Sequence, residues 1–118
     1  MRVCYEDYDA QQRFIDVDFP VYVKMDFAFD ETTYHNYVSY IKLDYVEGVY
    51  TRTHISIYNR DEYEWRKASI SIFKSEKPTI GITRYLESRA PEEPSTELEF
   101  KNAYKLVKDI ITEIESNL

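Results

Sequence analysis

Apolar and polar positions alternate through residues 21–29, and this pattern predicts a half-buried β-strand. The apolar positions that share one face are Val21, Val23, Met25, Phe27 and Phe29. The intervening positions are mostly charged or tyrosine. The acid- and threonine-rich stretch over 30–36 then predicts a turn.

The tyrosine-rich stretch over 34–58 predicts two further strands joined at Gly48, because tyrosine, valine and isoleucine favour strands over helices. A three-residue loop over 46–48 pairs Ile41 with Thr53 and collects the apolar side chains on one face. A two-residue Glu-Gly loop instead places Ile41 beside His54 and leaves two mixed faces. A slip of one residue is penalised wherever one face is buried, so the three-residue loop is predicted.

The same reasoning joins these two strands to the strand over 21–29 before them and to two strands after them, with loops over 30–36, 59–62 and 74–78. The predicted neighbours are Met25 and Ile41, Thr51 and Ile70, and Ile72 and Ile80. Residues 20–87 are therefore predicted to form a five-stranded antiparallel β-meander whose last strand follows the loop over 74–78 and contains Ile80 and Ile82.

A C-terminal amphipathic helix is predicted over 95–117. Pro91 and Pro94 end the sheet, and Thr96 with Glu99 matches a capping box. Apolar residues then recur at helical spacing: Phe100, Ala103, Tyr104, Val107, Ile110, Ile111, Ile114 and Leu118. The fold class predicted is α+β, with this helix on the apolar face of the sheet.

The chain of 118 residues is expected to be one domain, 1–118. Within its N-terminal segment, 1–19, the stretch over 9–17 is interpreted as a short helix with Phe14 and Ile15 against an edge or the open end of the sheet. The N-terminus lacks the pattern of a signal peptide, no apolar run is long enough for a membrane span, and the single cysteine forms no internal disulfide. These features predict a cytoplasmic protein.

The net charge and the absence of known motifs exclude several classes of function. The formal net charge of −7 disfavours nucleic acid as a partner, although residues 48–90 carry eight bases against five acids. Two glycines exclude a glycine-rich phosphate loop, and His35, His54 and Cys4 are not at metal-ligand spacing. Cys4 lies close to two acids and is expected to be an inert thiol. The sequence thus predicts no enzyme, no cofactor and no metal.

Two surfaces are candidates for binding. The predicted register turns an aromatic, mildly basic sheet face outward: Tyr40, Tyr50, Arg52, His54, Tyr58, Tyr63, Trp65 and Lys67. These residue types carry interface energy and stack on nucleotide bases, but cross-strand pairing within the sheet explains them equally well. The second candidate is acidic: Glu6, Asp7, Asp9, Asp16, Asp18, Glu92, Glu93, Glu97 and Glu99.

The function predicted is a small acidic binding protein that blocks a macromolecular partner, a protein above all, sterically or by nucleic-acid mimicry. In size, charge and lack of catalytic motifs it has the general character of immunity or anti-defence proteins and of phage- or plasmid-encoded inhibitors, without a motif that identifies a family. The alternative is a module that binds single-stranded nucleic acid or a nucleotide on the aromatic sheet face. That face would also suit a homodimer.

Overall fold

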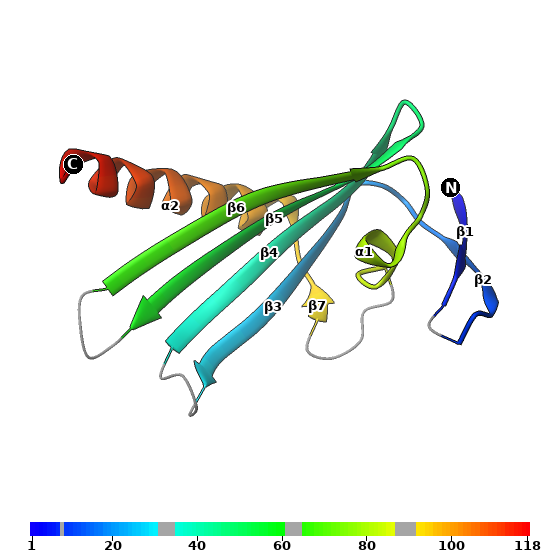
Figure 1. Cartoon of the computed structure of the whole chain (residues 1–118), viewed down its shortest axis with the longest axis horizontal. Helices are drawn as coiled ribbons and strands as arrows, with labels where there is room; N and C mark the ends of the chain where they lie inside the picture. Colours follow the sequence, from blue (N-terminus) through cyan, green and yellow to red (C-terminus); the bar gives the residue numbers. More distant parts are fainter. Residues whose placement is uncertain (8, 31–34, 61–64, 87–91) are drawn as a thin grey trace.

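The computed structural model describes residues 1–7, 9–30, 35–60, 65–86 and 92–118. The elements are β1 (Arg2–Glu6), β2 (Gln12–Asp16), β3 (Val21–Asp30), β4 (His35–Val46), β5 (Val49–Arg60), β6 (Trp65–Ser75), α1 (Ile80–Thr83), β7 (Glu92–Pro94) and α2 (Glu97–Ser116). The predicted α+β fold, a five-stranded antiparallel sheet with α2 packed on it, is confirmed (Figure 1).

The strand order in the main sheet is β6-β5-β4-β3-β7. The four strands β3 to β6 form the predicted meander, but the fifth strand is β7, which pairs with β3 at the far edge. The last predicted strand, which contained Ile80 and Ile82, is wrong: Ile80–Thr83 form the short helix α1, and residue 87 lies outside the described residues. Ile82, Tyr85 and Leu86 lie at helical spacing and pack on the core, whereas the alternation of Ile80 and Ile82 suggested a strand.

The turn between β4 and β5 has two residues, not three. Glu47 and Gly48 have φ of 53° and 81°, as a type I′ turn requires. Val46 consequently lies opposite Val49, and Ile41 lies opposite His54. The neighbouring registers also differ from the prediction, since Met25 lies opposite Ser39 and Ile55 opposite Ile70.

The reason for this register is that the sheet is covered on both faces. On the helix face, which α2 covers, the apolar residues come from β5 and β6, where Ile55, Ile57 and Ala68 pack against the helix. On the opposite face they come from β3 and β4, where Val23, Met25, Ile41 and Leu43 pack against β1 and α1. Each face is mixed because the two cores lie diagonally across the sheet.

The N-terminal segment is a β-hairpin, which corrects the helix predicted over 9–17. Val3 and Tyr5 alternate inward from β1, and Asp7 organises the turn by accepting hydrogen bonds from the backbone N–H groups of Asp9 and Gln11. Ile15 packs on the core, but Phe14 is exposed beneath the guanidinium of Arg2.

Helix α2 begins as predicted. The side chain of Thr96 accepts a hydrogen bond from the backbone N–H of Glu99. Only part of the predicted stripe is buried, namely Ala103, Val107 and Ile110, with Phe100 partly buried beside them. Every residue from 111 to 118 is exposed. In the described ranges, no helix is long and apolar enough to cross a membrane.

Candidate functional site

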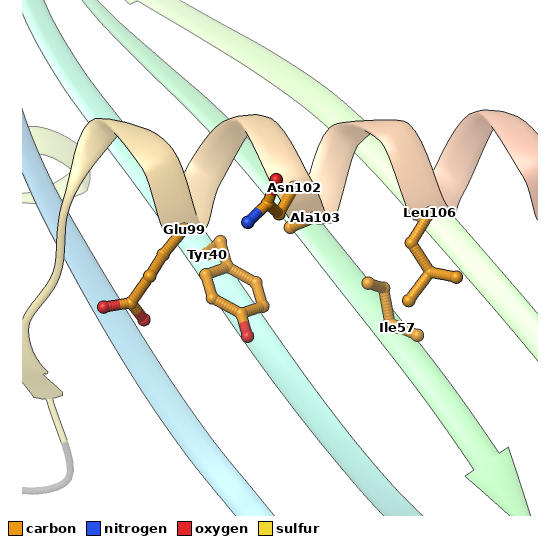
Figure 2. Close-up of a pocket in the computed structure, with 6 residues that line it drawn as sticks. All are labelled: Tyr40, Ile57, Glu99, Asn102, Ala103 and Leu106. Atoms are coloured by element: carbon orange, nitrogen blue, oxygen red, sulfur yellow. The ribbon is translucent and has the colours of Figure 1, made fainter.

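A pocket of about 240 Å³ lies between α2 and the sheet, on the helix face (Figure 2). Its lining residues are Tyr40, Ile57, Glu99, Asn102, Ala103 and Leu106. The four helical residues follow one another at spacings of three, one and three, so they share one side of α2. Tyr40 and Ile57 come from β4 and β5, whose register places both on the helix face. The pocket therefore forms where the helix crosses the two central strands.

The two ends of the pocket differ in polarity. At one end the carboxylate of Glu99 lies 4.0 Å from the ammonium of Lys24, which also lies 5.9 Å from the centre of the Tyr40 ring. At the other end lie the aliphatic side chains of Ile57 and Leu106, and Figure 2 shows the Tyr40 ring between the two ends. The volume is below the ~300 Å³ usual for sites that enclose a drug-sized ligand. A single long side chain with an apolar stem and a charged head matches this arrangement.

The predicted aromatic face is divided by the two-residue turn. Four of the residues lie on the face away from α2: Arg52, His54, Tyr58 and Lys67. Arg52 and His54 pair with Leu43 and Ile41, which pack under β1 and α1, and the alternation of the strands places Tyr58 and its partner Lys67 on the same face. Tyr40 lies on the helix face, within the pocket. Tyr50 is buried in the core with its ring 4.6 Å from that of Tyr45, and burial raises the pKa of Tyr50.

The last two of the eight predicted residues are Tyr63 and Trp65. Tyr63 lies outside the described residues. The backbone of Trp65 pairs with that of Arg60 at the start of β6.

Arg52 connects α1 to the sheet. Its Nη1 donates a 2.8 Å hydrogen bond to the carbonyl oxygen of Gly81, and its guanidinium lies 5.1 Å from the Phe73 ring and 5.7 Å from the Tyr85 ring. A Cβ on Gly81 would lie 3.2 Å from the Phe73 ring, so a larger residue there would need the ring to shift by a few tenths of an ångström. Arg52 is therefore engaged in packing.

His54 is partly buried next to Arg52. Burial lowers the pKa of His54, and the positive charges of Arg52 and Arg84 lower it further. The imidazole is consequently neutral at physiological pH. Tyr58 stacks on Tyr37 at 5.1 Å, and the ammonium of Lys67 lies 5.5 Å from the Tyr58 ring. Cross-strand contacts thus involve several of the side chains that had been candidates for a stacking platform.

Four of the candidate acids have intramolecular partners. Asp7 pairs with Arg13, whose hydrogen bond lowers the pKa of Asp7. The other three pairs are Glu92 with Arg84 at 3.9 Å, Glu97 with Lys101 at 2.8 Å, and Glu99 with Lys24. The remaining candidates are exposed: Glu6, Asp9, Asp16, Asp18 and Glu93. The acids therefore divide between structural contacts and free surface charge.

The described residues contain no group of three or more His, Cys, Asp or Glu side chains arranged to hold a metal ion. Cys4 is exposed, and its thiol donates to the Oε1 of Gln12 at 3.0 Å.

Sequence reasoning missed Lys24, Asn102 and Leu106 as residues in or beside the pocket. The spacing of Glu99, Asn102 and Leu106 was a detectable signal, because it marks a second side of α2 next to the apolar stripe. The position of Lys24 and Tyr40 under that side was not detectable without the correct register. Comparison with protein families, with curated proteins and with solved structures finds no match to this chain.

Proposed function

We propose that this chain is a small acidic binding protein that acts by occupying a protein partner, and that the pocket beneath α2 anchors a lysine or arginine side chain of that partner. The observation that carries the proposal is the polarity of the pocket, with Glu99 at one end and Ile57 and Leu106 at the other. Lys24 lies 4.0 Å from the Glu99 carboxylate, but the Glu99 side chain is 45% exposed and so remains accessible to a second cation. Long cationic side chains bury their stems along apolar surface and keep the charged head near a carboxylate or water.

Charge supports a basic partner. The net charge of −7 attracts a positively charged surface over the Debye length and speeds encounter with it. Glu93 and Glu97 are exposed next to the start of α2, so the pocket opens on an acidic stretch. Binding alone would block a basic functional site on the partner, and no catalytic group is needed. Inhibitors and immunity or anti-defence proteins act in this way.

The test is affinity capture with matched tryptophan variants. Asn102→Trp introduces a large side chain into the pocket, whereas Lys105→Trp adds the same side chain at an exposed position of α2 outside it. A genuine partner is retained by the wild type and by Lys105→Trp and is depleted by Asn102→Trp. Glu99→Gln should weaken the same interaction at low salt, with a smaller difference at high salt. Equal capture by all four proteins would remove the pocket from the proposal.

A second candidate function is binding of a short single-stranded oligonucleotide on the face opposite α2. It is supported by the exposure of Lys67, Ser69 and Ser71 beside His54, in the only net-positive part of the chain. Trp65 is the sole tryptophan, so its fluorescence should be quenched when short oligonucleotides are titrated at low salt. No change in emission would exclude this candidate.

A further inference from the structure

The sheet-facing stripe of α2 continues beyond the sheet. Ala103, Val107 and Ile110 are buried against β5 and β6, and the next position of the stripe is Ile114, which is 48% exposed. Figure 1 shows the red end of α2 on the outer side of β6. The last two turns therefore present an apolar side that no described part of the chain covers.

Strand β6 presents a matching apolar surface at the same edge. Ile70 and Ile72 lie on the helix face, and they are 46% and 62% exposed. Among the described strands, β6 pairs only with β5 and ends the sheet. The stretch over 68–73 carries no charged residue, proline or glycine, which are the usual means of protecting an edge. This strand is consequently competent to pair with another.

The charges of the two elements are complementary. Residues 65–75 contain three bases and no acid, and residues 109–118 contain three acids and no base. An α2 end placed over a β6 strand would bring these opposite charges together. Within one chain only Asp109 precedes Ile110, the last buried residue of α2, whereas Glu113 and Glu115 follow it on the exposed end of the helix.

We propose that two copies of the chain associate through their β6 edges, with the end of each α2 resting on β6 of the other copy. A two-fold axis perpendicular to the sheet pairs the strands antiparallel and keeps both helices on the same face, so each copy supplies both parts of the interface. Residues 111–116, the exposed end of α2, span about 9 Å at 1.5 Å per residue, and neighbouring strands are about 4.8 Å apart. The helix end is thus long enough to cover β6 of the second copy.

Apolar contact and charge together select the register. Pairing about Ser71 places Ile70 opposite Ile72 of the second copy and opposes no two bases. Pairing about Ile70 would place Lys74 opposite Arg66 of the second copy, and like charges directly opposite each other are destabilising. Pairing about Ser69 would oppose no two bases but would place Ile72 opposite Arg66 of the second copy, without a contact between isoleucines. The proposed dimer is therefore centred on Ser71. It is separate from the pocket, since Tyr40 and Glu99 lie on the other side of α2 from this edge.

The first test is sedimentation across the micromolar range. The wild type should reach twice the 14.2 kDa mass of one chain, and Ile72→Asp with Ile114→Asp should remain at one. Leu98→Asp is the control, because Leu98 is 68% exposed at the start of α2, away from β6. A monomeric wild type, or equal dissociation by the control, would overturn the proposal.

The second test is disulfide trapping in a Cys4→Ser background. Ser71 and Ser69 are both exposed on the same face of β6. Ser71→Cys should form a covalent dimer under mild oxidation, because partners across antiparallel strands have Cα atoms about 5 Å apart, within disulfide range. Ser69→Cys should not, since the proposed register separates its two copies by about 13 Å. Equal trapping of both variants, or trapping of Ser69→Cys alone, would contradict the register.

Discussion

Ser39 and Ser56 lie directly opposite each other in β4 and β5, with their hydroxyl oxygens 2.8 Å apart and both side chains buried. They stand where the apolar half of the face opposite α2 meets its polar half. A buried hydroxyl without a partner is costly, so each serine satisfies the other. The pair joins the two halves of the sheet by a side-chain contact.

Ser56→Ala should destabilise the fold by about 1–3 kcal/mol, because it leaves the Ser39 hydroxyl buried without this partner. The double variant Ser39→Ala with Ser56→Ala should cost less than the sum of the two single changes, since both polar groups are then removed together. Urea unfolding measures the differences. Ser69→Ala, at an exposed position opposite Ser56, is the control and should change stability by less than about 0.5 kcal/mol. Additive single and double effects would argue against the mutual bond.

Glu47→Asn should stabilise the fold by about 0.5–1 kcal/mol. Glu47 has a φ of 53°, a region that costs most L-residues about 1–2 kcal/mol but that asparagine tolerates. The same substitution at Glu76, which does not have a positive φ, should give no gain. Thermal unfolding of the two variants compares them directly. A gain at Glu76 equal to that at Glu47 would point to charge removal instead of turn geometry.

Adjacent isoleucines in α2 should respond very differently to truncation. Ile110 is 3% exposed against the sheet, and Ile110→Ala should cost about 2–5 kcal/mol, as should Ile57→Ala beneath the helix. Ile111 is 38% exposed in one chain, so Ile111→Ala should cost well under that range in the monomer. Denaturant unfolding at low protein concentration makes the comparison, and equal losses at 110 and 111 would mean that α2 is rotated about its axis.

His54 should make the fold less stable as the solution becomes mildly acidic. Burial, followed by Arg52 and Arg84, holds the folded-state pKa of His54 below the unfolded value of about 6.5. The stabilising contribution is therefore complete above that value and is lost as the pH falls toward and through the folded pKa. His54→Asn should show a shallower loss of stability below the unfolded pKa than the wild type. An NMR titration that placed the His54 pKa at or above 6.5 would contradict this.

The elements of the fold were predictable because their patterns are local. Alternation identified β3, and Thr96 marked the start of α2. The register was not predictable by the same means, since the argument assumed one buried face. With one buried face, Ile41 beside His54 is unfavourable; with a different cover on each face, Ile41 packs under β1 and α1 while Ile55 packs under α2.

One of the remaining errors came from a segment whose neighbour lies far away in sequence. Glu92–Pro94 forms a strand only because the edge of β3 is free to pair with it. Two other segments carried a correct local pattern beside a misleading one. Val3 and Tyr5 alternate as in a strand, although a helix was predicted for 9–17. Ile82, Tyr85 and Leu86 have helical spacing, although the alternation of Ile80 and Ile82 suggested a strand. The pocket depended on register, because Tyr40 reaches it only when β4 turns that side chain toward α2.

The sheet separates the two hydrophobic cores from each other. The cluster under α2 and the cluster under β1 and α1 lie on opposite sides of it, and they are linked through the backbone of β4 and β5. Detachment of α2 would uncover Ile55 and Ile57 but leave Ile41 and Leu43 enclosed. Amide hydrogen exchange should accordingly resolve two levels of protection, a lower one for α2 and a higher one for β4, with the two covers opening independently.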